Sequence, residues 1–296
     1  MDLQAYLKRC VGLVDDALDH WLPAETMMPS ELHKAMRYSV FAGGKRIRPV
    51  LMIASCEAAG GAAEAVLPAA CAMEMVHTYS LIHDDLPAMD DDDFRRGRPT
   101  SHKVFGEALA ILAGDALLTE AFDLLTREEA LPGVGAEVRL RLTHLLARAA
   151  GSRGMVAGQV VDMDSEGRDI DFPTLEYIHT RKTGALILAA VQMGALIGGA
   201  PGGTFEALTD YGRAAGLAFQ IADDILDVVG DQELLGKDVG SDQERGKATY
   251  PALLGLEEAR QRAREMRDRA LAAVEPLGKK AEPLRDIAHF IVDRSF

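Results

Sequence analysis

Helical periodicity extends along nearly the whole chain and limits the folds that it can adopt. Apolar residues recur at helical spacing, and short glycine- and proline-rich turns, such as residues 131–135 and 198–203, separate the segments. No convincing run alternates between apolar and polar residues, as a half-buried strand requires. Aromatic residues, which strands favour, make up only 5% of the chain. The sequence therefore predicts an all-α fold.

Chain length and the continuity of this pattern bear on domain organisation. The 296 residues approach the upper size of a domain with one core. No low-complexity linker or repeat of fixed period interrupts the helical pattern. We therefore expect a single domain over residues 1–296.

Charge and cysteine content argue against several classes of protein. The formal net charge of −14 is unfavourable for binding nucleic acid, whose phosphates attract basic surfaces. Cys10, Cys56 and Cys71 lack metal-binding spacing, and the first residues lack the apolar run of a signal peptide, so we expect a reduced, cytoplasmic protein. Residues 184–200 are apolar but shorter than the roughly 20 residues of a membrane span. We expect a buried core helix there and no membrane span.

The first acidic cluster follows an apolar helical segment, residues 73–82. Six of the ten residues from 84 to 93 are aspartate, among them Asp84, Asp85 and Asp90. An acidic run is usually a solvated loop, but this one continues a core helix. On an ideal helix Asp84 and Asp90 would point about 120° apart, and Pro87 disturbs the helix. A bulge or loop must therefore bring these carboxylates together.

The second acidic cluster, Asp223, Asp224 and Asp227, lies inside another apolar helical segment. At about 100° per residue, Asp223 and Asp227 lie within about 40° of each other, with Asp224 about 60° from Asp227. The three carboxylates thus share one face. Two such clusters on buried helices would be costly without cations. Oxygen ligands with no cysteine nearby favour a hard metal ion, Mg²⁺ or Mn²⁺.

Basic residues stand beside the acidic clusters or near glycines. Arginine offers a bidentate fork to phosphate oxygens, lysine a point charge, and glycines let backbone N–H groups approach an anion. Each group alone is equally consistent with a solvated basic turn, but beside metal-binding carboxylates they indicate a phosphate ester as the ligand. The candidates are Lys45, Arg48, Arg95, Arg96, Lys182, Lys237 and Lys247.

Taken in order, these motifs resemble those of the trans-prenyl diphosphate synthases. The resemblance runs from about residue 30 to the C-terminus, and the joint occurrence of the motifs is specific. It is carried by the run Gly43-Gly44-Lys45-Arg46-Ile47-Arg48-Pro49 and by His77, Asp84, Asp85, Asp90, Arg95, Arg96, Lys182, Thr183, Gln220, Asp223, Asp224, Asp227 and Lys237.

The resemblance implies a fold and a metal set. It implies an isoprenoid-synthase-type helical bundle around a deep apolar cavity, assembled as a homodimer. The metal set it implies is three Mg²⁺ ions, for which Mn²⁺ can substitute, bridging an allylic diphosphate to both clusters: Asp84, Asp85, Asp90, Asp223, Asp224 and Asp227. Whether Asp224 and Asp227 bind metal directly or through water stays open in the sequence.

The same resemblance assigns the remaining residues of the site. It implies that isopentenyl diphosphate is bound by Lys45, Arg48, His77 and Arg96, although a lone histidine on an apolar helix is usually a core residue. The allylic diphosphate, dimethylallyl or geranyl, is assigned to Arg95, Lys182, Thr183, Gln220, Lys237 and Lys247. Catalysis is assigned to Asp84, Asp85, Asp90, Lys182, Thr183, Gln220 and Asp223, with Thr183, Gln220 and the Lys182 carbonyl stabilising an allylic cation.

Product length is expected to depend on the helix that carries the first cluster. Tyr79 and Ser80 lie about one helical turn before Asp84, and a bulky Tyr79 would close the floor of the cavity. Ordinary core packing is the alternative role for Tyr79. Together with the four residues between Asp85 and Asp90, this resembles bacterial farnesyl diphosphate synthases and implies a fifteen-carbon product. Geranylgeranyl and geranyl diphosphate stay open as alternatives.

Three other functions fit the sequence less well. A class I terpene cyclase shares the acidic motif but needs no second diphosphate pocket, which Lys45, Arg48 and Arg96 predict. A metal phosphohydrolase would need further histidines near His83, and the remaining histidines supply no coherent set. A non-catalytic partner subunit typically lacks one acidic cluster, whereas both are complete here.

Overall fold

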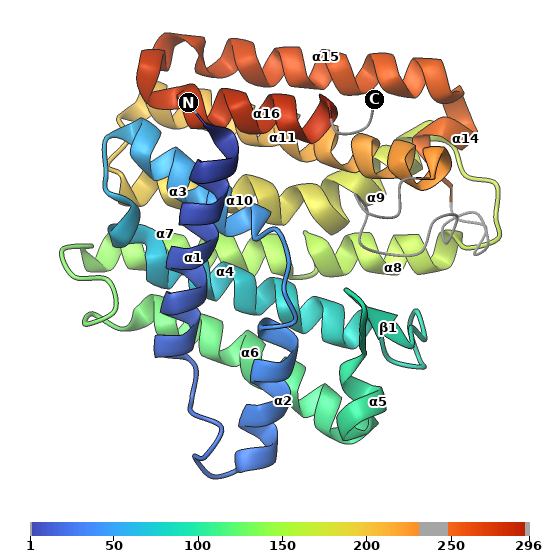
Figure 1. Ribbon diagram of the computed structural model, residues 1–296. Helices are drawn as coiled ribbons and strands as arrows, with labels where there is room; N and C mark the ends of the chain where they lie inside the picture. Colours follow the sequence, from blue (N-terminus) through green and yellow to red (C-terminus); the bar gives the residue numbers. More distant parts are fainter. Residues whose placement is uncertain (1, 231–247, 294–296) are drawn as a thin grey trace.

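The computed structural model describes residues 2–230 and 248–293, which are helical almost throughout (Figure 1). Two short antiparallel strands pair Phe94 with Pro99. The elements are α1 (Leu3–Trp21), α2 (Ser30–Val40), α3 (Ile47–Ala59), α4 (Ala63–Asp84), β1 (Phe94–Arg95), β2 (Arg98–Pro99), α5 (Ser101–Phe105), α6 (Glu107–Thr126), α7 (Ala136–Ala150), α8 (Met155–Ser165), α9 (Phe172–Ile178), the π-helix η1 (His179–Gly184), α10 (Ala185–Ile197), α11 (Gly202–Val229), α14 (Tyr250–Leu254), α15 (Leu256–Val274), the 3₁₀-helix η2 (Glu275–Ala281) and α16 (Glu282–Asp293).

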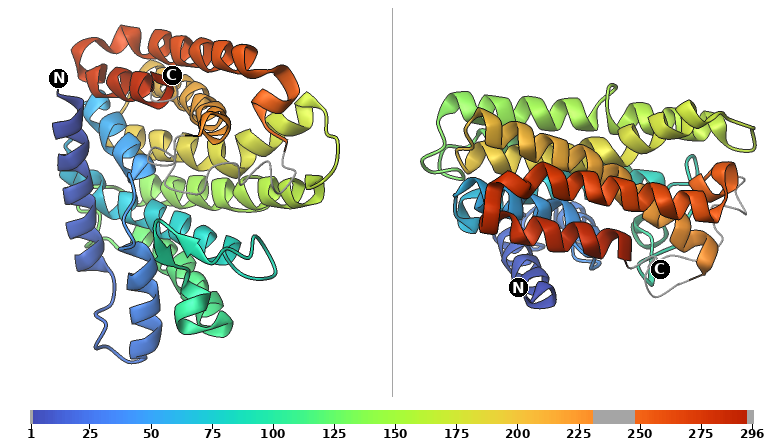
Figure 2. Two further views of the ribbon diagram at one scale, coloured as in Figure 1. Left: turned by 45° about the vertical axis from the view of Figure 1, so that its right-hand side comes forward. Right: turned by 90° about the horizontal axis from the view of Figure 1, so that it is seen from above.

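The long helices follow one another in layers. Helix α15 packs on α11, α11 on α10, α10 on α3, α3 on α4, and α4 on α6. Figure 1 shows this succession from α15 at the top to α6 below, with α1 crossing in front of α4. Figure 2 shows α15 and α16 side by side along α11. The predicted all-α fold is confirmed over the described residues.

The middle layers consist of apolar helices. Most residues of α4 and α10 are buried, as expected for helices that are hydrophobic on all sides. The core helix predicted for residues 184–200 is confirmed as α10. By length and composition α4 is the one described helix that could cross a membrane, but 72% of that stretch is buried among other helices. Its apolar surface is therefore accounted for by packing.

Local sequence explains several helix ends near the predicted site. The side chain of Asp171 caps α9 by accepting from the Thr174 N–H, and Thr249 caps α14 by accepting from the Ala252 N–H. Helix α3 begins after Arg46, which is left-handed at φ 48° although it is not a glycine. This unusual conformation falls inside one of the predicted phosphate-binding runs.

Candidate active site

The first acidic cluster turns back on itself where α4 ends. The N–H of Asp90 donates to the carbonyl of Asp84 at 2.8 Å, and the N–H of Asp91 donates to the carbonyl of Leu86 at 3.1 Å. These bonds form the bulge that the sequence predicted around Pro87. They bring Asp90 back beside Asp84.

The carboxylate of Asp84 lies in unfavourable electrostatic surroundings. Burial raises its pKa to about 6, the neighbouring Lys182 opposes that rise, and the charge of Asp90 adds to it. Burial is thus the main cost of keeping a negative charge on Asp84. A cation at Asp84 and Asp90 would relieve it.

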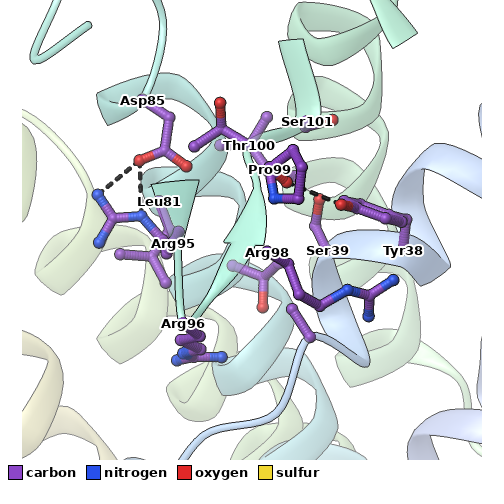
Figure 3. A pocket seen from close by; sticks show the side chains of 13 residues that line it. Tyr38, Ser39, Leu81, Asp85, Arg95, Arg96, Arg98, Pro99, Thr100 and Ser101 are labelled. Carbon is purple, nitrogen blue, oxygen red and sulfur yellow. Dashed lines mark hydrogen bonds and ion pairs between the residues drawn. The ribbon is translucent and has the colours of Figure 1, made fainter. Parts of the chain in front are cut away.

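Asp85 was predicted to bind metal and Arg95 to bind the allylic diphosphate, and in the structure the two form an ion pair with each other. Asp85 is only 3% exposed and accepts from Arg95 Nε at 2.6 Å and from Arg95 Nη2 at 2.5 Å (Figure 3). Arg95 also reaches Asp92, at 3.1 Å. The pair attaches the β1–β2 hairpin to the end of α4.

A small pocket separates this hairpin from α2 and α4, and Tyr38 of α2 closes its other side (Figure 3). The Tyr38 hydroxyl donates to the Pro99 carbonyl at 2.8 Å, and the Arg98 guanidinium lies 4.3 Å from the centre of the Tyr38 ring. The hairpin is therefore held from both sides, which fixes Arg96 between β1 and β2.

Lys182 projects from the π-helix η1 toward the first cluster. Its Nζ donates to Asp162 of α8 at 2.7 Å. Burial lowers the pKa of Lys182, but the negative charges of Asp162 and Asp84 together raise it by more than burial lowers it. The net shift is upward, and the amine stays protonated. A Cβ on Gly158 would collide with the Lys182 backbone, so this glycine permits the close packing of α8 on η1. Sequence reasoning missed Asp162, because its partner Lys182 lies 20 residues further along the chain.

The second acidic cluster has three different environments. Asp223 is half-buried, whereas Asp224 and Asp227 are 3% and 1% exposed. The Asp224 Oδ2 atom accepts from His179 Nε2 and from the Tyr250 N–H, both at 2.9 Å, and its Oδ1 atom accepts from Gln220 at 3.3 Å. Asp224 thus ties α11 to η1 and to the start of α14. Direct metal binding by Asp224 stays a prediction, since protein donors reach both of its oxygens.

His179 is a second residue that sequence reasoning missed. Its ring is buried and stacks on the Tyr250 ring with centroids 5.4 Å apart. The partners Asp224 and Tyr250 lie 45 and 71 residues away along the chain, too far for a local pattern to link them. It joins the turn that carries Lys182 to the second acidic cluster.

Arg48, His77 and Arg96 form a cluster with surplus positive charge. Burial lowers the pKa of Arg48 and of Arg96. Burial also lowers the pKa of His77 well below its usual value, and the charges of Arg48 and Arg96 add to this shift. The buried Nε of Arg48 has no hydrogen-bond partner among the described residues. An anion would satisfy this cluster.

The run 43–48 and the hairpin meet at this cluster. Arg96, left-handed at φ 54°, donates from Nη1 to the Gly43 carbonyl. Gly44 has φ +130°, and a Cβ there would lie 2.6 Å from Arg96 Cζ, so only glycine allows this approach. Lys45 is exposed on the same loop. Of the four residues predicted to bind isopentenyl diphosphate, the structure therefore gathers Arg48, His77 and Arg96 at the meeting point of α3, α4 and the hairpin, with Lys45 on the adjoining loop.

The remaining predicted residues are placed as follows. Tyr79 is 8% exposed and its ring lies nearly perpendicular to that of His83, with centroids 5.5 Å apart, and burial, followed by the charge of Asp84, raises its pKa. The Ser80 hydroxyl donates to the His77 carbonyl at 2.8 Å, within its own helix. Thr183 follows Lys182 in η1. Lys237 and Lys247 lie outside the described residues.

The acidic clusters offer oxygen donors of the kind that Mg²⁺ prefers. Among residues 2–230 and 248–293, no three His, Cys, Asp or Glu side chains are grouped closely enough to enclose a metal ion. Magnesium is usually held by one or two carboxylates and completes its octahedron with substrate phosphates and water. The carboxylate oxygens of Asp84 and Asp90, which lie side by side, suit this mode.

Comparisons with known proteins agree with this arrangement. Residues 29–284 match the family model described as polyprenyl synthetase. The farnesyl diphosphate synthase of Geobacillus stearothermophilus is 52% identical over 264 residues, 88% of each chain. A geranylgeranyl diphosphate synthase of Cyanophora paradoxa is 46% identical over 295 residues, 99% of this chain and 97% of the relative. The crystal structure of an FPP/GFPP synthase from Zymomonas mobilis has a TM-score of 0.87 at 40% identity, covering 98% of this chain and 99% of that one. As the order of its motifs predicted, this chain belongs to the polyprenyl synthetase family.

Proposed function

We propose that this chain is a trans-prenyltransferase that joins isopentenyl diphosphate to an allylic diphosphate, with farnesyl diphosphate as its main product. One observation carries the proposal: a cluster of basic side chains, Arg48, Arg96 and the neutral His77, neighbours the buried carboxylate of Asp84 with Asp90 beside it. The first suits a diphosphate directly, and the second suits a diphosphate that arrives with cations. Relatives named for farnesyl and geranylgeranyl products support the same reaction.

The positive cluster, Arg48, His77 and Arg96, supports binding of isopentenyl diphosphate, the substrate whose C–O bond is not broken. Arg48 and Arg96 offer guanidinium donors to diphosphate oxygens. His77, whose pKa is lowered well below its usual value, is a neutral imidazole at neutral pH and donates one hydrogen bond without adding charge. Held there, isopentenyl diphosphate keeps its C–O bond and presents its double bond as the nucleophile.

The residues beside the acidic clusters support ionisation of the allylic substrate. Bound at Asp84, Asp90 and Asp223, Mg²⁺ would neutralise the leaving diphosphate as a Lewis acid. Lys182, kept protonated by Asp162 and Asp84, would hydrogen-bond the same diphosphate and stabilise the charge that develops as its C–O bond breaks. Because the Gln220 amide N–H donates to Asp224, its carbonyl oxygen is left as a partially negative group for the allylic cation.

The proposed reaction balances without another reactant. The allylic C–O bond breaks with both electrons on diphosphate, and the double bond of isopentenyl diphosphate attacks the resulting cation. The new tertiary cation loses a proton to the departing diphosphate, which Lys182 and Arg95 would retain nearby. The product is five carbons longer and is again an allylic diphosphate.

One assay tests this function. The protein is incubated with geranyl diphosphate, isopentenyl diphosphate and Mg²⁺, and product length is measured. We expect a fifteen-carbon diphosphate whose formation requires isopentenyl diphosphate, with Asp84→Asn slower by about a hundredfold or more. Asp93→Asn is the matched control, because Asp93 belongs to the same acidic run but is exposed and pairs with Lys103. A hydrocarbon formed without isopentenyl diphosphate would indicate a terpene cyclase instead.

The assembly and location implied by the family resemblance are also part of the proposal. We expect a homodimer in solution and a cytoplasmic enzyme that accepts Mn²⁺ in place of Mg²⁺. Light scattering tests the oligomeric state, and titration of each metal into chelator-treated protein tests the metal.

A further inference from the structure

A buried ion pair lies beneath the loop that carries Lys45 and Arg48. Arg46 is 3% exposed and Glu74 of α4 is 2% exposed, and Arg46 Nη1 donates to Glu74 Oε1 at 2.7 Å. Arg46 also donates from Nη2 to the Val40 carbonyl of α2 at 2.6 Å and from Nε to Asp15 of α1 at 3.0 Å. One guanidinium therefore joins α1, α2 and α4 at the start of α3.

The pair holds a conformation that costs free energy. Arg46 is left-handed at φ 48°, which disfavours a side chain with a Cβ, and burying two charges is itself costly. Replacing such a pair with apolar residues is often neutral or stabilising. Global stability is therefore a poor explanation for the pair, and its position suggests another role.

The Arg46–Glu74 pair connects the loop that carries Arg48 to the helix α4 that carries His77. Arg46 follows Lys45 and precedes Arg48 by two residues, while Glu74 precedes His77 by three residues, about one turn of α4. Glu74 is also the leading negative charge that counteracts the lowering of the pKa values of Arg48 and Arg96. It is therefore the buried counter-charge beneath this cluster.

We propose that Arg46 and Glu74 are positioning residues for isopentenyl diphosphate, which hold the 43–48 loop on α4 so that Arg48 and His77 converge on one diphosphate. This inference rests on the proposed function. Both side chains are buried beneath the loop and act through Arg48 and His77. The allylic side depends instead on Lys182 and Asp162, which belong to η1 and α8. Breaking the pair should therefore weaken the binding of isopentenyl diphosphate far more than the binding of the allylic diphosphate.

Separate KM measurements for the two substrates test the inference. For Glu74→Gln we expect the KM for isopentenyl diphosphate to rise about tenfold or more, because one charge-assisted hydrogen bond is lost. The KM for geranyl diphosphate should change by less than about twofold. Glu57→Gln is the matched control. Glu57 accepts from Tyr6 at 2.7 Å and from Arg9 at 2.8 Å and so ties α1 to α3 away from the loop. We expect this control to lose stability without a split in KM.

A double variant covers the case in which Glu74→Gln does not fold. Arg46→Met with Glu74→Leu removes both buried charges together, and the groups that lose a donor are the half-exposed Asp15 carboxylate and the Val40 carbonyl at the end of α2. We expect it to fold and to show the same split. Equal rises in both KM values, or none, in a folded variant would overturn the inference while leaving the function intact. A wild-type protein that fails to use isopentenyl diphosphate would overturn the proposed function first.

Discussion

At the scale of single residues, Tyr79 offers the sharpest test of product length. It lies one turn before Asp84 on α4, and its pKa responds to the charge of Asp84, so the two side chains are near neighbours. If its ring closes the floor beneath the reacting diphosphate, Tyr79→Ala should release products of twenty carbons or more at similar turnover. Chromatography of the dephosphorylated products measures this. Tyr79→Phe is the control and should keep the fifteen-carbon product. If Tyr79→Ala still stops at fifteen carbons, the ring is ordinary core packing.

His77 should make stability depend on pH with a defined sign. Burial, together with Arg48 and Arg96, lowers its pKa well below the usual 6.5 in the folded protein. Below pH 6.5 the unfolded chain therefore binds a proton at His77 that the folded chain does not bind, so folding is weakened as pH falls. Relative to His77→Gln, wild type should lose up to about 1.4 kcal/mol of unfolding free energy per pH unit below 6.5. Urea unfolding between pH 5 and 7.5 measures it, and parallel curves would contradict it.

At the scale of elements, local patterns predicted what lies within one helix but not what joins two. The bulge around Pro87 was predictable because six residues of helix would leave Asp84 and Asp90 apart, and the bond from Asp90 to the Asp84 carbonyl confirms it. The environment of Asp224 was not predictable. Its donors, His179 and Tyr250, come from segments that only the packing of η1 and α14 brings to α11.

The tie through Asp224 predicts that the three aspartates of the second cluster are not equivalent. Asp224→Ala would leave the buried His179 ring and the Tyr250 N–H without an acceptor, so we expect a loss on the order of 3 kcal/mol of unfolding free energy. Asp223→Ala, half-buried beside Arg48, should instead leave stability nearly unchanged and impair activation by Mg²⁺. Urea unfolding and Mg²⁺ titrations of both variants separate the two roles. Equal stability of the two variants would show that the tie contributes little.

At the scale of the whole molecule, the helical class was readable from sequence because apolar residues recur at helical spacing within the segments. The motif order supplied most of the candidate site for a similar reason, since runs such as residues 43–49 and 84–90 are contiguous. Asp162 and Glu74 were missed because the role of each depends on a partner about 20 to 30 residues away, Lys182 and Arg46. Such pairs exist only once the layers have packed.

Because the proposed site spans α3, α4, η1 and α11, its ligands should stabilise the whole fold jointly. On its own, Mg²⁺ meets the carboxylates near Asp84, and inorganic pyrophosphate alone meets basic side chains such as Arg48 and Lys182. Together they bridge the helices, so the rise in Tm with both should exceed the sum of the separate rises. At a hundredfold excess over Kd, a ligand adds about 2.7 kcal/mol, or about 4 °C for a chain of this size. Scanning calorimetry measures the shifts, and EDTA should remove the joint part. Asp84→Asn should lose that part while keeping the response to pyrophosphate alone. Strictly additive shifts in wild type would mean that the metal and the diphosphate bind at independent sites.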